Sequence, residues 1–437
     1  MNLINKYQNS NKKLFNNSIA FFTTFFGQVG VQIIFPPLMI LVWGIEYFGI
    51  IIYLIAIPST LSFLIFNFTS SARQEMAKFH LKKKVEVVNK IYSNTVFLAF
   101  ISYLLFIFSS LVFVSFFKSE QLENYISTQD FYNIIILLIL SFSLGFFNDI
   151  HSLKISYMGV YHISKYVDIF FDILIKISII IVGFIYKDIF YIFIFYFVIN
   201  LLKTSCFYYY NSKIKKISFD IKQINLSDIK NNIYKAIPYY FIQLDEIFKT
   251  SFVTIIISSF FDFKIVALVS TIRTMFYFFP RRFFELIVEL LQYDYVKLLM
   301  TKNFNKLTKL YKNQNLVILV LSLIFVIFSH FIGLKMFNIW TNNSFQIENK
   351  IFYFLILDCF FFLMTNSIIS FLKSINNFFS FSVVLIISQI ILITTLYILY
   401  NNSYDYGAFF SLSLTVSFLV FCISFIYYRS SLNQMKN

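Results

Sequence analysis

The sequence predicts an all-α integral membrane protein with about 12 transmembrane helices, and three observations support this class. Of the 437 residues, 59% are hydrophobic and 13% are charged, whereas soluble domains average ~45–50% and ~25%. One crossing needs ~20 mostly apolar residues, so the apolar share suffices for about twelve crossings. The apolar residues also form long runs, unlike the alternating pattern of membrane β-strands. These features exclude a soluble globular enzyme and a membrane β-barrel.

Apolar runs separated by polar breaks mark the individual helices. The first run follows Lys12 and Lys13 and is too long for the apolar part of a signal peptide. The two shortest breaks lie at Lys187–Asp188 and at 262–264. The candidate helices span residues 18–42, 47–68, 92–117, 131–150, 163–186, 189–210, 236–258, 263–283, 315–336, 351–372, 379–400 and 407–428.

The distribution of Lys and Arg predicts the orientation. Of the 36 basic residues, 28 fall in segments on the side of the N-terminus, 5 on the opposite side and 3 within helices. Because basic loops stay in the cytoplasm, we expect both termini there. The net charge of +15 is therefore an orientation signal, and nucleic acid is not expected as a partner.

The longest polar connection near the middle of the chain predicts the domain division. We expect an N-terminal six-helix bundle (residues 1–212), a cytoplasmic linker (213–235) and a C-terminal six-helix bundle (236–437). Each half has an even number of helices, so both halves enter from the same side. Two such bundles are related by an axis along the membrane normal, which is a known transporter plan.

The sequence lacks the motifs of soluble enzymes. It has no phosphate-binding glycine loop, no HExxH and no paired-cysteine metal site. Its cysteines, Cys206, Cys359 and Cys422, lie in apolar runs. We therefore expect a transporter with no catalytic residue, no metal and no cofactor.

Charged residues inside helices are the strongest functional candidates, because each costs ~2.5–3.5 kcal/mol at the bilayer centre. Arg273 has no acidic residue three or four positions away, so its partner must come from another helix. Asp245 and Lys249 are four residues apart, and Glu246 adds an acidic charge beside them. Candidates for a substrate cavity are Arg273, Lys249, Asp245, Gln28, Gln32 and Asn67.

A second set of charges could couple transport to an ion or a proton. Asp168, Asp172 and Lys176 recur every four residues and share one helix face. Pairs such as Asp172 with Lys176, or Asp245 with Lys249, could instead neutralise each other within one helix. The coupling candidates are Glu246, Asp358, Asp168, Asp172 and Lys176.

Two stretches resemble a known family. The end of the first helix and the start of the second read Pro36-Pro37-Leu-Met-Ile-Leu-Val-Trp-Gly44-Ile-Glu46-Tyr47-Phe48-Gly49, followed by Ser71-Ala72-Arg73, and Ile237-Pro238 opens the seventh helix. This pattern resembles the Wzx-type polysaccharide and O-antigen flippases of the multidrug/oligosaccharidyl-lipid/polysaccharide (MOP) exporter superfamily. The length, the twelve helices and the orientation agree with that family over the whole chain.

The resemblance implies two six-helix bundles around a cavity lined mainly by helices 1, 2, 7 and 8. It implies a flippase for a polyprenyl-pyrophosphate-linked oligosaccharide (an O-antigen, lipopolysaccharide or other surface-polysaccharide unit) in the bacterial cytoplasmic (inner) membrane. Lys249 and Arg273 would hold the pyrophosphate, and Gln28, Gln32 and Asn67 would meet sugar hydroxyls. Membrane lipids and other polysaccharide-assembly proteins would be its partners.

Two other functions stay open. A cation-coupled multidrug or metabolite exporter of the same superfamily would use Asp245, Glu246 or Asp358 as a proton or sodium site. A membrane polysaccharide polymerase or glycosyltransferase would show a large external loop or an acidic metal-binding pair outside the membrane. Neither feature is evident in the sequence.

Overall fold

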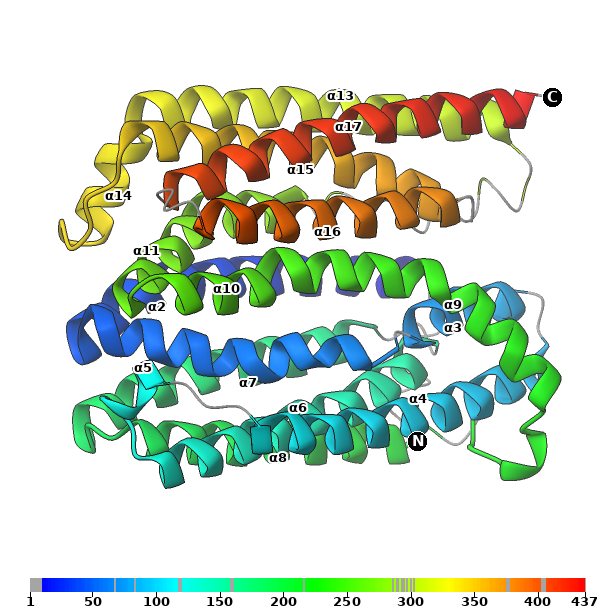
Figure 1. The fold of residues 1–437 in the computed structure, drawn as a ribbon. Coiled ribbons are helices and arrows are strands. Elements are labelled where there is room, and N and C mark those ends of the chain that lie inside the picture. Colours follow the sequence, from blue (N-terminus) through cyan, green and yellow to red (C-terminus); the bar gives the residue numbers. More distant parts are fainter. Residues whose placement is uncertain are drawn as a thin grey trace. The chain divides into compact units, whose positions relative to one another are not determined.

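All regular elements of the described residues are helical (Figure 1). The computed structural model describes residues 10–66, 68–81, 84–116, 120–157, 161–214, 217–284, 287, 291, 295, 298, 301, 303–374, 378–401 and 406–436. The helices of the first half are α2 (Ser10–Leu61), α3 (Phe68–Leu81), α4 (Val85–Phe116), α5 (Glu120–Glu123), α6 (Thr128–Tyr157), α7 (Tyr161–Ile185) and α8 (Ile189–Ser212). Those of the second half are α9 (Leu226–Ile247), α10 (Val253–Phe260), α11 (Phe263–Arg273), α13 (Phe304–Phe328), α14 (Leu334–Trp340), α15 (Asn349–Ser374), α16 (Phe379–Asn401) and α17 (Tyr406–Lys436).

Short helical turns complete the described chain. Two are 3₁₀ turns, η1 (Ser62–Leu64) and η2 (Ile221–Gln223). Three are π turns, η3 (Phe248–Phe252), η4 (Thr274–Phe278) and η5 (Ser329–Gly333). Each π turn directly continues an α-helix, so it changes the rotation of the residues that follow without ending the helix.

The described helices agree with the predicted all-α membrane fold. Nine of them are long and apolar enough to cross a bilayer, and the first, Phe22–Leu64, has 43 residues. A helix of that length would measure about 65 Å, more than twice the ~30 Å of hydrocarbon. Gly44 adopts φ 77° and ψ 169° and divides α2 into two segments. Three further crossings complete the twelve expected. They are the second segment of α2, helix α7, and α9 taken together with α10.

Both of the shortest predicted breaks are present. The Asp188 carboxylate caps α8 by accepting a 2.9 Å hydrogen bond from the backbone N–H of Phe190. Helix α10 ends at Phe260 and α11 begins at Phe263. At the first break, a polar side chain thus bonds to a free backbone N–H at the start of a helix.

The sequence reading missed helices in the polar connections. Residues 70–91 lie between the second and third candidate helices and were expected to be a polar connection. Most of them form α3 and the start of α4. The expected linker 213–235 contains η2 and the first turns of α9. It is held to α4, because the backbone N–H of Asp220 donates to Ser93 (3.0 Å) and that of Asn225 to Asn94 (3.3 Å).

Contacts group the chain into two compact units. Unit 1 contains the residues up to Val31 and Leu38–Val266, and unit 2 contains Gln32–Pro37 and Ala267–Asn437. Helix α9 belongs to unit 1 because it packs on α3 and α4. The division into six-helix bundles at 213–235 stays a prediction.

Close helix packing in unit 1 depends on glycine at two positions. A Cβ atom on Gly49 would lie 2.0 Å from the carbonyl oxygen of Phe263. A Cβ atom on Gly183 would lie 2.3 Å from the indole nitrogen of Trp43. Any side chain there would push α2 away from α11 or from α7.

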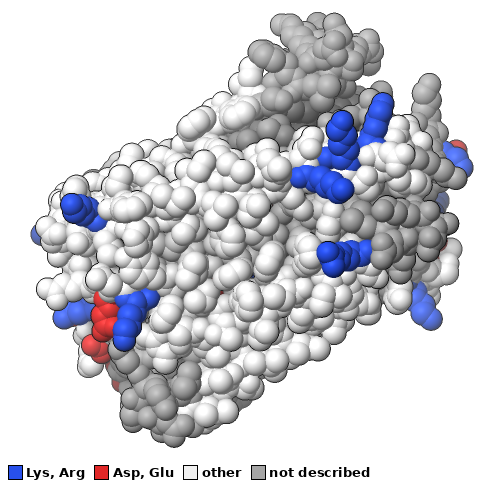
Figure 2. Space-filling view, turned by 90° about the horizontal axis from the view of Figure 1, so that it is seen from above, with Lys and Arg blue, Asp and Glu red and all other residues white. Residues whose placement is uncertain are grey.

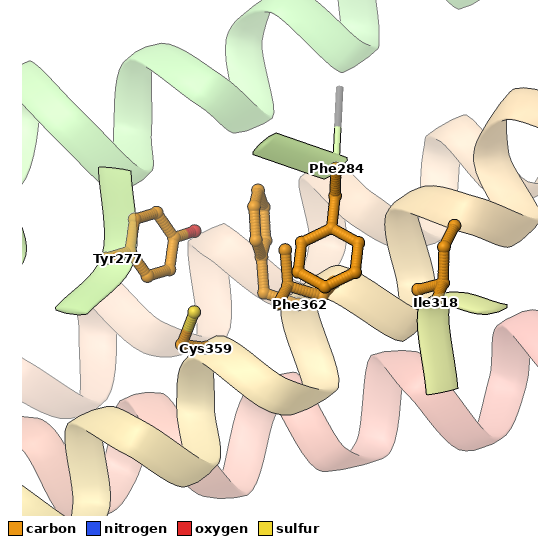
Figure 3. Close-up of a cluster of buried hydrophobic side chains, with 6 residues drawn as sticks. Tyr277, Phe284, Ile318, Cys359 and Phe362 are labelled. Atoms are coloured by element: carbon orange, nitrogen blue, oxygen red, sulfur yellow. The ribbon is translucent and has the colours of Figure 1, made fainter. Parts of the chain in front are cut away.

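Helix α15 forms the centre of unit 2, and it packs between α13 and α17. A cluster of buried side chains joins α15 to α13 and to the segment after α11 (Figure 3). Its members are Tyr277, Phe284, Ile318, Cys359, Phe362 and Leu363. Two of its members, Tyr277 and Phe362, contact arginines described below.

Unit 2 also contains the proline pair of the first helix. Pro37 has no N–H to donate to the Ile33 carbonyl one turn earlier. The indole N–H of Trp340 donates to that carbonyl instead, at 2.6 Å. A side chain from α14 thereby satisfies a backbone group that the proline leaves free.

Candidate functional site

Arg273 ends α11 and immediately precedes the π turn η4. Its guanidinium carbon lies 5.5 Å from the ring centre of Tyr277 and 5.6 Å from that of Phe278. Contacts of this kind contribute roughly 0.5–2 kcal/mol, more when water is excluded. The two rings therefore orient an arginine that lies inside a predicted membrane span.

A second arginine lies on the other side of the same aromatic pair. Tyr277 packs against Phe362 of α15 with ring centres 4.6 Å apart (Figure 3). The guanidinium carbon of Arg281 lies 5.5 Å from the Phe362 ring centre. Arg273, Tyr277, Phe362 and Arg281 thus form a row of two cations around two rings, which we call the arginine–aromatic row.

One acidic residue, Asp358, accompanies the arginine–aromatic row. Asp358 lies one turn before Phe362 on α15 and interacts electrostatically with Arg273. Its carboxylate accepts a 3.2 Å hydrogen bond from the Ser413 hydroxyl of α17, and the residue is 8% exposed. Two guanidinium groups and one carboxylate therefore lie close to the same pair of rings. Sequence reasoning found Arg273 and Asp358 but not Arg281, which it assigned to a basic connection.

Asp245 and Lys249 pair within unit 1, one helical turn apart and 2.9 Å between charged atoms. Asp245 is buried in α9, whereas Lys249 belongs to the π turn η3. Two residues on, Ser251 hydrogen-bonds to Ser59 of α2 at 2.6 Å. The intrahelical ion pair that the sequence allowed for Asp245 and Lys249 is therefore present. The neighbouring Glu246 is exposed.

Asp168 and Asp172 share one lysine from the adjacent helix. The Lys203 ammonium of α8 lies 2.9 Å from Asp168 and 3.2 Å from Asp172. The sequence analysis placed Lys203 within the candidate helix 189–210 but gave it no partner. Lys176 lies one turn beyond Asp172 on α7. Two carboxylates thus share one bridging cation.

A further polar cluster lies where α2 meets the start of α11, and the sequence reading did not find it. Glu46 accepts a hydrogen bond from Tyr125 (3.2 Å) and pairs with Lys264 (3.0 Å). Partial burial and the Glu46 carboxylate raise the pKa of the Tyr125 hydroxyl, so it stays protonated and donates. This cluster ties three chain segments of unit 1 together.

The amide candidates of the first helix fall in different units. Gln28 belongs to unit 1, and Gln32, beside the proline pair, belongs to unit 2. The side-chain oxygen of Gln32 is buried and has no hydrogen-bond partner among the described residues. Asn67 lies outside the described residues. Lys249 and Arg273 likewise belong to units 1 and 2 respectively.

No protein-family model matches the chain, and no curated protein matches its sequence. Solved structures do match. A MATE structure in complex with MaD3S is 14% identical, with a TM-score of 0.63 over 97% of this chain and 96% of that one. The Vibrio cholerae MATE transporter VcmN is 14% identical, with a TM-score of 0.62 over 97% of each chain.

A transporter of the MOP superfamily from Pyrococcus furiosus is 12% identical, with a TM-score of 0.60 over 98% of this chain and 96% of that one. These similarities extend over nearly the whole of each chain. The protein therefore has the fold of the MATE transporters of the MOP superfamily.

Proposed function

We propose that this protein is a flippase in the bacterial cytoplasmic membrane. Its cargo is a polyprenyl-pyrophosphate-linked oligosaccharide for O-antigen or another surface polysaccharide. The observation that carries the proposal is the arginine–aromatic row, in which two guanidinium groups lie against two aromatic rings. Arginine suits this cargo because its planar fork binds two phosphate oxygens at once.

The cargo explains why cations are placed inside apolar helices. A glycan and a pyrophosphate cannot enter hydrocarbon without compensation, whereas the prenyl chain remains in the lipid. Exposing a cationic site alternately to the two sides would move the polar head without covalent chemistry. Tyr277 and Phe362 hold the arginine side chains, which reduces the entropy lost on binding.

Other candidate residues have supporting parts in this proposal. Lys249, held by Asp245, is a further cation for the pyrophosphate. Gln28, Gln32 and Asn67 would contact sugar hydroxyls, and the free side-chain oxygen of Gln32 suits such a contact. Membrane lipids and other polysaccharide-assembly proteins remain the proposed partners.

The test is complementation of a strain that lacks the gene, scored by surface polysaccharide on a gel. We expect Arg273→Ala and Arg281→Ala each to reduce the polysaccharide, and the double variant to abolish it. Substitution of both by Lys, which keeps the charge but not the fork, should restore only part of the activity. Lys249→Ala, alone and with Arg273→Ala, tests the cation in unit 1.

Lys335→Ala is the matched control, because Lys335 is an exposed cation of α14. It should leave the polysaccharide unchanged. Membrane fractions must contain equal amounts of each variant. A stably inserted Arg273→Ala/Arg281→Ala protein that still supports full polysaccharide synthesis would disprove the cationic-site proposal.

The second candidate is a cation-coupled drug or metabolite exporter. Two of the similar structures are described as multidrug resistance MATE transporters. The carboxylates of Asp168 and Asp172 are 38% and 42% exposed and share one lysine, so they are accessible to a cation. Glu246, Asp358 and Lys176 are the remaining coupling candidates. Drug susceptibility of the deletion strain, with unchanged polysaccharide, would favour this function.

A further inference from the structure

The basic residues of the two units have different partners. In unit 1, Lys90 pairs with Asp228 at 2.5 Å and Lys235 pairs with Glu75. In unit 2, α13 and α17 contain no acidic residue. Four of their cations are exposed and form no ion pair with any described residue. They are Lys306, Lys309 and Lys312 of α13 and Arg429 of α17.

These four residues form one surface, which we call the basic surface. At 100° per residue, Lys306, Lys309 and Lys312 fall within an arc of about 120° on α13. The rings of Tyr311 and Tyr428 are 4.8 Å apart and join α13 to α17 at the same level. Lys312 and Arg429 are the next residues along each helix. Figure 2 shows basic side chains gathered toward the ends of this face, with uncharged surface between them.

Apolar side chains continue the basic surface along the helices. Leu316, Leu319 and Leu323 are exposed and follow the lysines on the same side of α13. Phe425, over which the Arg429 guanidinium lies at 5.2 Å, is exposed as well. A row of cations next to an exposed apolar strip matches the two parts of a phospholipid, its headgroup and its acyl chains.

We propose that the basic surface binds the headgroup of an anionic phospholipid, whose acyl chains lie along the leucines of α13. The orientation predicted by the basic residues places it in the cytoplasmic leaflet, where anionic headgroups attract basic segments. The surface is separate from the arginine–aromatic row. The proposal therefore goes beyond the transport function and does not depend on the cargo.

The experiment measures thermal unfolding of the purified full-length protein in detergent, titrated with phosphatidylglycerol or with phosphatidylcholine. A lipid that binds the folded state raises the unfolding midpoint. We expect phosphatidylglycerol to raise it and phosphatidylcholine to have little effect. Each lysine near a headgroup strengthens binding by roughly fivefold, so Lys306→Gln/Lys309→Gln/Lys312→Gln should weaken it on the order of a hundredfold.

The matched control is Lys335→Gln/Lys350→Gln, which removes exposed cations outside the basic surface. It should bind phosphatidylglycerol as the unchanged protein does. Arg429→Gln alone, a milder variant, should weaken binding about fivefold. Equal stabilisation by both lipids, or unchanged phosphatidylglycerol binding by the triple variant, would overturn the proposal. If the basic surface instead binds an acidic cytoplasmic protein, both lipids should stabilise the protein equally, or neither should stabilise it. Either result would also overturn the proposal.

Discussion

The charged residues inside the helices have different kinds of neighbours. Lys203 pairs with both Asp168 and Asp172. Lys249 is matched by Asp245. In the arginine–aromatic row, two guanidinium groups lie against two rings, with Asp358 interacting with Arg273. Unit 1 thus places carboxylates around a lysine, whereas unit 2 places arginines around aromatic rings.

The first prediction concerns Lys203. Lys203→Met should destabilise the protein because it leaves two carboxylates facing each other without a cation. Breaking a buried ion pair costs ~3–5 kcal/mol and breaking an exposed one ~0–1 kcal/mol. Because the carboxylates are about two-fifths exposed, we expect about 1–3 kcal/mol. Thermal unfolding in detergent measures the loss.

Two variants control for this result. Lys222→Met removes an exposed lysine that forms no ion pair with a described residue, and it should leave the unfolding midpoint unchanged. Replacing Asp168 and Asp172 by Asn in the Lys203→Met protein removes the repulsion and should recover much of the stability. If this triple variant unfolds as early as Lys203→Met, repulsion between the carboxylates is not the cause.

At the scale of elements, the irregular turns of the helices coincide with the charged candidates. Lys249 lies in the π turn η3, and Arg273 is the residue before η4. In a π turn one extra residue is inserted, and such turns are frequent at functional sites. The turns rotate the following residues, so hydrophobic periodicity alone could not predict which side chains Arg273 and Lys249 meet.

The proline pair gives a prediction at this scale. Trp340→Phe removes the indole N–H that donates to the Ile33 carbonyl, and we expect a loss of about 0.5–1.5 kcal/mol in stability. Pro37→Ala restores a backbone N–H one turn away from Ile33. In the Pro37→Ala protein, Trp340→Phe should therefore cost much less. A double-mutant cycle of thermal unfolding midpoints measures this coupling, and equal losses in both backgrounds would contradict it.

For the whole molecule, the sequence predicts the parts that depend on long apolar runs. The all-α membrane fold and the two shortest breaks are confirmed, because the apolar runs and Asp188 are local signals. Helix α3 was missed because its sequence, with Arg73 and Glu75, resembles a polar loop until α4 and α9 pack against it. Arg281 and Lys203 gained their roles only through neighbours distant in sequence, Phe362 and Asp168.

The orientation and the twelve crossings depend most on α7, whose charges keep it outside the nine apolar spans. Cysteine labelling tests it, with Cys206, Cys359 and Cys422 replaced by Ala and one new cysteine per variant. Tyr186→Cys and Lys350→Cys should react with a membrane-impermeant maleimide on intact cells. Lys222→Cys and Lys312→Cys should react only after permeabilisation.

These four positions test the crossing of α7, and Asn124→Cys, in the exposed turn before α6, tests the orientation. If α7 does not cross, residue 186 stays on the cytoplasmic side and every later loop changes sides, so all four positions exchange their labelling while residue 124 still labels on intact cells. If the whole chain is inverted, residue 124 exchanges as well. Each site is exposed in the structure, so a failure to label reports sidedness and not burial. The expected pattern would place the basic surface beside the cytoplasmic leaflet, as anionic lipid binding requires.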